Sequence, residues 1–150
     1  TNDERRAPTL YLPPQDPADE DLPPAPACHD VDPAAEAEAP ATLSSVRDAL
    51  FMPSCGFSAC HGETKAGGLD LRAADLHAEL LGHDVAGADP PLIAPGDPDG
   101  SWLYRLLSRC EPTDDSGAAG RHMPLNAPFL LDPGLVNKVR AWIAAGAKDD

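Results

Sequence analysis

Apolar residues recur at helical spacing most clearly near the end of the sequence. Five of them follow Asp132-Pro133 at spacings of one, three or four residues: Leu135, Val136, Val139, Trp142 and Ile143. Aspartate before proline is a typical N-cap and first-turn pair, and glycine commonly follows the end of a helix. The pattern therefore predicts an amphipathic helix from Asp132 to about Gly146.

Three shorter apolar stretches predict three shorter helices, over about 42–53, 75–82 and 101–110. Each begins with a side chain that can accept a hydrogen bond from a free backbone N–H group, namely Thr42 or Ser44, Asp75 and Ser101. Pro53 marks the end of the first helix, because proline cannot continue the hydrogen-bonding pattern, and Gly82 marks the end of the second.

No stretch alternates between apolar and polar positions as a half-buried strand does. We therefore predict an all-α domain with short helices and long loops. The loops at 62–74 and 82–100 are longer than a compact domain normally has without a functional reason. We expect them to surround something other than protein.

Proline and acidic residues distinguish residues 1–40 from the rest of the chain. This segment has nine of the 18 prolines and ten of the 25 acidic residues, against two basic ones. Proline fixes φ and removes a backbone donor, so extended polyproline-like chain is favoured there. We predict a Pro/Asp/Glu-rich extended arm at 1–40 and a folded domain at 41–150. The arm is either a solvated linker or a segment that wraps a partner or the domain itself.

The net charge of -14 argues against nucleic acid as a partner, because phosphates need more than the 11 Lys and Arg present. An acidic carrier with a basic partner fits this charge better. No run of 18 apolar residues occurs, so we expect no transmembrane segment. Aromatic residues make up only 5% of the chain, which indicates that something beyond side-chain packing supplements the core.

The motif that carries chemistry is Cys55-Gly56-Phe57-Ser58-Ala59-Cys60-His61-Gly62. A histidine directly after the second of two cysteines is the arrangement used for covalent haem, in which two thiols bind the vinyl groups and the imidazole binds iron. The usual motif has two residues between the cysteines, whereas this one has four. The segment must therefore bulge out of a regular helix.

Two other interpretations of Cys55 and Cys60 stay open. The pair can form a small disulfide loop, since a bulged loop brings two Cα atoms within about 7 Å. Alternatively, the cluster can bind another metal. Zinc is poorly suited, because a closed zinc site takes four Cys or His ligands in paired spacing and only one compact cluster is present.

The order of five motifs resembles the small cytochrome-c-like domains of secreted bacterial proteins. These motifs are Cys-x4-Cys-His-Gly at 55–62, Gly-Gly-Leu-Asp-Leu at 67–71, Pro-Gly-Asp-Pro-Asp-Gly-Ser-Trp-Leu at 95–103, Met-Pro at 123–124 and Trp-Ile-Ala-Ala-Gly-Ala at 142–147. The resemblance covers about residues 42–148. It implies one covalent haem c, with His61 as the proximal and Met123 as the distal ligand of the iron. His122, directly before Met123, is a competing ligand.

Two protein ligands on the iron would leave no open position for a substrate. We therefore expect a monohaem electron-transfer protein rather than an enzyme, located in the periplasm or outside the cell. Its expected partners are redox proteins, including a membrane-bound electron-transfer complex. Two alternatives remain: a haem-free, disulfide-stapled secreted interaction domain, and a haem enzyme such as a peroxidase, which needs a vacant distal position.

Residues close to these motifs in the sequence are candidates for the surroundings of the haem. Apolar side chains that would exclude water from the ring are Phe57, Leu69, Leu71, Trp102, Leu106 and Phe129. Arg72, Tyr104 or Arg105 would bind the haem propionates.

Cys28 and Cys110 remain once Cys55 and Cys60 are set aside. Haem is attached outside the cytoplasm, where disulfides persist, so this even remainder predicts a disulfide that tethers the arm to the end of the Trp102 helix. In a rival interpretation, Ala25-Pro26-Ala27-Cys28-His29 is a single-cysteine haem attachment sequence. The surrounding prolines oppose the helix that such a site needs.

Overall fold

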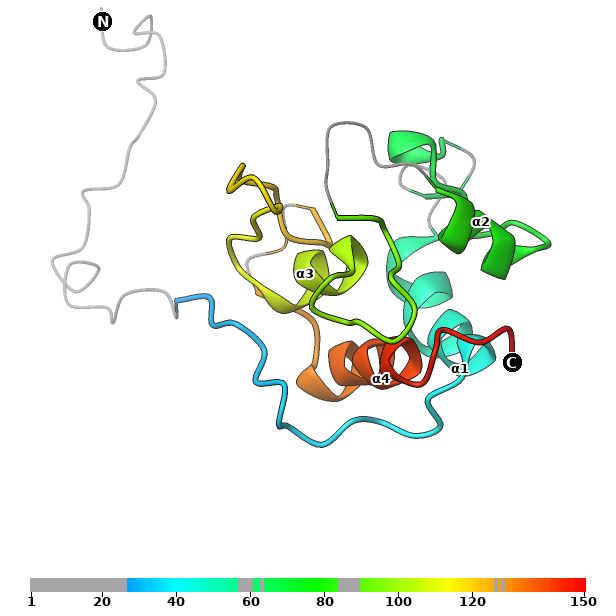
Figure 1. The fold of residues 1–150 in the computed structure, drawn as a ribbon, viewed down its shortest axis with the longest axis horizontal. Coiled ribbons are helices and arrows are strands. Elements are labelled where there is room, and N and C mark those ends of the chain that lie inside the picture. The colour runs from blue at the N-terminus through cyan, green and yellow to red at the C-terminus, as the bar shows by residue number, and fades with distance from the viewer. Residues whose placement is uncertain (1–26, 57–60, 63, 84–89, 126, 128) are drawn as a thin grey trace, which may run out of the picture.

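The regular elements of the described part of the chain are four short α-helices and two other helical segments, joined by long loops (Figure 1). This part contains no strand. The structure is a computed structural model that describes residues 27–56, 61–62, 64–83, 90–125, 127 and 129–150. The elements in chain order are α1 (Leu43–Val46), the π-helix η3 (Arg47–Cys55), the 3₁₀ turn η4 (Ala66–Gly68), α2 (Leu76–Gly82), α3 (Trp102–Ser108) and α4 (Pro133–Ala144). The predicted all-α class is confirmed. None of the helices in these residues is long and apolar enough to cross a membrane.

Side-chain caps start three of the four α-helices as predicted. The side chains of Thr42, Asp75 and Asp132 accept hydrogen bonds from the backbone N–H groups of Ser45, Ala78 and Gly134. The predicted cap at Ser101 is wrong. The Ser101 hydroxyl accepts from the Ala94 N–H at 2.8 Å and donates to the Asp97 carbonyl at 2.9 Å, so it fixes the loop before α3 instead.

The first helical run does not end at Pro53, as predicted, but continues to Cys55. After α1 the chain widens into the π-helix η3, in which the Gly56 N–H donates to the Phe51 carbonyl, five residues back, at 2.6 Å. Pro53 lacks an N–H, and because it lies near the end of the run the loss stays local. The last turn of this helix therefore places Cys55.

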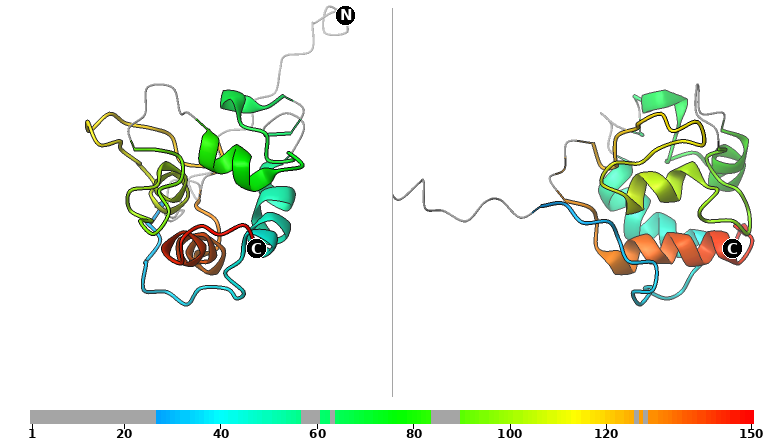
Figure 2. Two further views of the ribbon diagram at one scale, coloured as in Figure 1. Left: turned by 45° about the vertical axis from the view of Figure 1, so that its right-hand side comes forward. Right: turned by 60° about the vertical axis from the view of Figure 1, so that its left-hand side comes forward.

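One hydrophobic core joins the helices, with α4 at its centre. The α4 residues Val136, Val139 and Ile143 are completely buried and Trp142 is 1% exposed. α4 packs against both α1 and α3, and Figure 2 shows α3 running alongside α4. Such burial of the apolar face supplies most of the stability of a short helix.

Residues 27–42, which we call the strap, cross α4 as extended chain and lead into α1 (Figure 1). The buried Asn137 side chain donates to the carbonyls of Asp32 and Ala35, each at 2.9 Å, and the buried Lys138 donates to the Pro40 carbonyl at 3.2 Å. The last third of the expected arm is thus bound to the domain. Residues 1–26 lie outside the described residues.

The segment after α4 ties three helices together. The Asp150 side chain accepts from the Leu43 N–H at 3.0 Å, and its backbone oxygen accepts from the Ser44 N–H at 2.9 Å, both at the start of α1. The His77 ring of α2 forms a hydrogen bond with the Ala147 carbonyl at 2.8 Å. The chain thus returns to the helix on which the strap ends.

Candidate functional site

Hydrogen bonds hold the backbone of His61 next to Cys55. The His61 N–H donates to the Cys55 carbonyl at 3.2 Å, which closes the loop between the two residues. On its other side, the His61 carbonyl accepts from the Leu71 N–H at 2.8 Å. Cys60 and the rest of 57–60 lie outside the described residues. The structure therefore places the first cysteine and the histidine of the motif together and leaves the second cysteine unplaced.

Two histidine side chains have a buried nitrogen without a hydrogen-bond partner among the described residues. These are Nδ1 of His61 and Nδ1 of His122, while the rest of each side chain is half-buried. A buried polar nitrogen without a partner costs about 1–3 kcal/mol, so native structures rarely leave one. Both imidazoles therefore have a nitrogen that no described protein group uses.

Met123 lies in a loop, half-buried, and packs against the hydrophobic core. Its N–H donates to the carbonyl of Leu106 in α3 at 2.9 Å. Cys55 packs against the same core from the end of η3. Met123, the predicted thioether ligand, and Cys55, the first cysteine of the motif, thus both pack against the core.

The apolar candidates for the haem surroundings divide into two groups. Leu69, Leu71 and Trp102 are buried in the core, at 6%, 3% and 8% exposure, and Leu106 packs against it. Phe129 is 48% exposed and does not belong to this group. Phe57 lies outside the described residues.

Residues 109–123, which we call the return loop, carry the chain from the end of α3 back along that helix to Met123. Arg105 holds the loop with its guanidinium, which donates to the Thr113 carbonyl at 3.1 Å and to Asp115 at 2.7 Å. A third bond goes to the Asp99 carbonyl at 2.7 Å. Arg105 was a candidate for a propionate, but these bonds occupy it with the chain itself.

A tight turn reverses the return loop at Asp114. Its carboxylate accepts from the Ser116 hydroxyl at 2.6 Å and from the Ala118 N–H at 2.9 Å. The Ser116 hydroxyl is the main reason that the pKa of Asp114 lies below its ordinary value, with the Ala118 N–H second. The turn is therefore set by an ionised aspartate at neutral pH.

Tyr104 and Arg140 meet between α3 and α4. Tyr104 is 4% exposed, and its hydroxyl forms hydrogen bonds with Ser108 and Arg140. Burial raises the pKa of Tyr104 above its ordinary value of 10.0, the charge of Arg140 opposes this rise, and the charge of Asp99 adds to it. Nε of Arg140 is buried without a partner among the described residues.

Arg140 is the basic residue that the sequence analysis missed. Unlike Arg105, Arg140 has a buried donor without a partner among the described residues. In the sequence it is marked by a positive charge two positions before Trp142, among the apolar residues of this helix. Arg72 does lie beside the motif, because a Cβ on Gly56 would be 3.7 Å from its Cγ. Arg72 is thus the candidate arginine that lies beside the motif, whereas Arg140 lies beside Tyr104.

The donor set fits a covalent haem. Cys55 supplies a thiol at the core, His61 a buried nitrogen without a partner, and Met123 a thioether against the same core. The chain has no significant match to any protein-family model, curated protein or solved structure. In the part of the chain that the structure describes, no three His, Cys, Asp or Glu side chains gather as ligands for a free metal ion.

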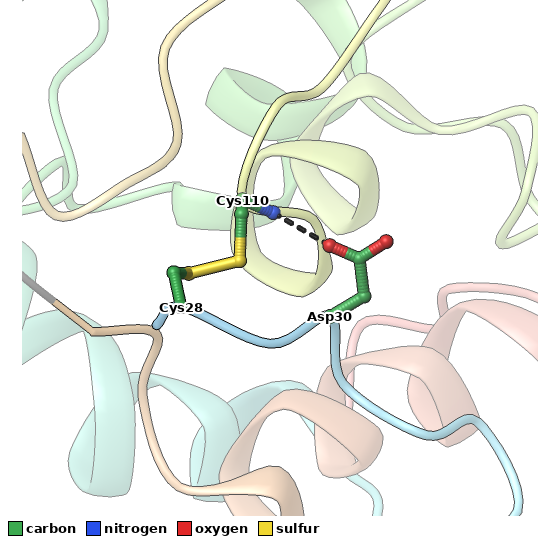
Figure 3. Close-up of a disulfide and its surroundings, with 3 residues drawn as sticks. All are labelled: Cys28, Asp30 and Cys110. Atoms are coloured by element: carbon green, nitrogen blue, oxygen red, sulfur yellow. Dashed lines mark hydrogen bonds between the residues drawn. A yellow bond between two sulfur atoms is a disulfide. The ribbon is translucent and has the colours of Figure 1, made fainter. Parts of the chain in front are cut away.

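The predicted disulfide between Cys28 and Cys110 is confirmed (Figure 3). It joins the start of the strap to the chain just after α3, with the two Cα atoms 6.0 Å apart. Asp30 accepts from the Cys110 N–H at 2.9 Å, and the Val31 N–H donates to the Ser108 carbonyl at 2.7 Å. The rival interpretation of Cys28 as a haem attachment site is wrong, because its sulfur is bonded to Cys110.

A polar cavity of about 390 Å³ lies between α1, α2 and the C-terminal segment. Four of its polar side chains are engaged with the chain itself. Asp75 caps α2, His77 binds the Ala147 carbonyl, Arg47 pairs with Asp48, and Asp150 binds the start of α1. These contacts stabilise the fold.

Proposed function

We propose that this protein is a monohaem c-type cytochrome that carries electrons between redox partners outside the cytoplasm. One observation carries the proposal. His61 is tied by its backbone to Cys55, and Cys55 and Met123 both lie against one apolar core. This arrangement brings the cysteine and the histidine of the motif together and puts a thioether against the same apolar core.

Each residue has a distinct role in the proposal. Cys55 and Cys60 hold the haem through thioether bonds, His61 binds the iron as the proximal ligand and Met123 as the distal one. The bound haem supplies an iron that alternates between the ferrous and ferric states. The methionine sulfur and the apolar core favour the ferrous state and raise the reduction potential. Two ligands supplied by the chain would leave no open position on the iron for a substrate, which supports electron transfer rather than an enzymatic reaction.

The disulfide supports a location outside the cytoplasm. Disulfides persist in oxidising compartments such as the bacterial periplasm and are rare in the cytoplasm. Cys28–Cys110 joins residues 82 positions apart. We place the protein in the periplasm or at the cell exterior, where its partners are redox proteins, including a membrane-bound electron-transfer complex.

Haem attachment is the direct test. The chain expressed with a cytochrome c maturation system should carry one haem that acid-acetone does not extract. The reason is that two thioether bonds survive conditions that break iron ligation. Intact-protein mass and visible absorption measure this outcome. A Cys55→Ser/Cys60→Ser variant, which leaves the Cys28–Cys110 bridge intact, is the matched control and should lose the haem.

A polypeptide of unmodified mass, with Cys55 and Cys60 joined to each other, would contradict the proposal. That result would favour the haem-free, disulfide-stapled interaction domain. A haem that binds an added ligand such as cyanide at once would indicate a vacant distal position and hence an enzyme.

Removal of residues 1–26 should weaken electrostatic association while it leaves the visible spectrum unchanged. The deletion takes six acidic and two basic residues and spares the strap and Cys28. Acidic extended chain attracts a basic partner surface, and screening removes the effect beyond about 8 Å at physiological ionic strength. Electron transfer with hexaammineruthenium, a cationic reagent, should slow severalfold at low salt.

Two controls separate charge from length in this experiment. Ferricyanide, an anionic reagent, should react with the truncated chain at least as fast as with the full chain. Conversion of the six Asp and Glu residues within 1–26 to amides should reproduce the truncation. Equal rates for full and truncated chains with the cationic reagent would reduce the arm to a passive linker.

A further inference from the structure

Gly120 lies against the ring of Trp102 where the return loop runs back along α3. A Cβ on Gly120 would be 2.8 Å from Cζ2 and 2.9 Å from Cη2 of Trp102. Ordinary carbon contacts begin near 3.4 Å, so any side chain would force the two apart. The Gly120 N–H also donates to the Pro112 carbonyl at 2.8 Å, which fixes the residue on its other side.

Lack of space for a side chain, and not backbone conformation, requires glycine at this position. Gly120 is not among the glycines with positive φ, whereas Gly117 in the same loop has φ +85 and nothing within 4 Å of a Cβ. Trp102 cannot easily yield. Its side chain is buried in the core, with the residue 8% exposed, and its backbone N–H donates to the Pro91 carbonyl at 2.9 Å, which fixes the start of α3.

The loop thus rests on α3 at two points one helical turn apart. Gly120 contacts Trp102, and three residues later the Met123 N–H donates to the Leu106 carbonyl at 2.9 Å. Trp102 and Leu106 are separated by about 6 Å along the helix. Contact at the first point therefore sets where the Met123 side chain begins.

We propose that Gly120 is a positioning residue for the distal ligand, which it holds by allowing the return loop to lie directly on the Trp102 ring. This inference rests on the proposed role of Met123. A methyl group at 120 would lift the loop by at least about 0.6 Å, and a ligand site must be held to within about 0.5 Å of its productive geometry. The result is a methionine sulfur that no longer stays on the iron.

The test compares Gly120→Ala with Gly117→Ala in the haem-loaded protein. Gly120→Ala should lose most of the sulfur-to-iron charge-transfer band and have a lower reduction potential, with its covalent haem still attached. Gly117→Ala strains the same loop but meets no ring, so it should keep the band even if its midpoint of thermal unfolding falls. A purely structural role for Gly120 would lower the unfolding midpoint and leave the band in place.

A second substitution guards against a variant that does not fold. Trp102→Phe shortens the ring, so the double variant Gly120→Ala/Trp102→Phe should show the same band as Trp102→Phe alone. A Gly120→Ala protein with the full band overturns the inference. So does a folded double variant whose band is weaker than that of Trp102→Phe alone. Absence of the band in the unsubstituted protein that carries haem would instead refute the methionine ligation on which the inference depends.

Discussion

Replacement of Met123 by alanine should abolish the sulfur-to-iron charge-transfer band and lower the reduction potential by on the order of 100 mV or more, since axial ligands set haem potentials over a range of about 0.8 V. A soft neutral donor that stabilises ferrous iron is lost, and water or a harder ligand replaces it. The haem itself should stay attached through Cys55 and Cys60. Visible spectroscopy of the oxidised protein and a redox titration measure the two effects.

His122→Ala is the matched control for this experiment. His122 directly precedes Met123 and has a buried Nδ1 without a partner among the described residues, so it is the competing ligand on structural grounds as well. If Met123 is the ligand, His122→Ala keeps the band. If instead the Met123→Ala protein is unchanged and His122→Ala alters the spectrum, the distal assignment passes to His122.

Removal of the Cys28–Cys110 bridge should destabilise the domain by about 4 kcal/mol, and lower its Tm by about 10 °C. The bridge closes a loop between residues 82 positions apart, and restriction of so long a loop removes much entropy from the unfolded chain. Haem that restrains the unfolded chain would reduce the effect. Urea unfolding of the Cys28→Ser/Cys110→Ser variant measures it.

Substitution is preferable to reduction here, because a thiol reductant would also change the oxidation state of the iron in the proposed cytochrome. Single variants at Cys28 and at Cys110 should each lose as much stability as the double variant, since either one opens the bridge. A double variant within about 0.5 kcal/mol of the intact protein would show that hydrogen bonds such as those of Val31 and Asn137 hold the strap without the bridge.

The helices could be predicted from the sequence because their signals are local. Asp75 and Asp132 bind N–H groups within three residues, and the apolar spacing of α4 matches the face that it buries. Pro53 misled the prediction. Whether this proline ends the helix depends on the hydrogen-bonding pattern of the whole segment, and here it lies near the end of a π-helix.

The contacts of the strap could not be predicted from local sequence signals. Its prolines predict extended chain, but backbone carbonyls are alike in every residue, so nothing in residues 27–42 shows what they bind. The partners were visible only as two polar residues, Asn137 and Lys138, inside the apolar pattern of α4. Both are buried, and each donates a hydrogen bond to a backbone carbonyl of the strap.

For the candidate site the sequence supplies a set of residues, and their role as haem ligands stays a prediction. Motif spacing identified Cys55, His61 and Met123, and the structure places all three beside the core or beside one another. The commitment of Arg105 to the return loop and the contact of Gly120 with Trp102 depend on how a 15-residue loop folds back. No local pattern encodes that path.

Because the strap docks on α4, the domain closes late during synthesis. Asp32 finds its partner Asn137 105 residues later, and Cys28 has none until Cys110 is made. Cys55, Cys60 and His61 leave the ribosome before either event, since chains emerge N-terminus first. Without α4 the core around Cys55 is incomplete. If haem is attached as proposed, this topology would leave the attachment segment accessible until the domain closes.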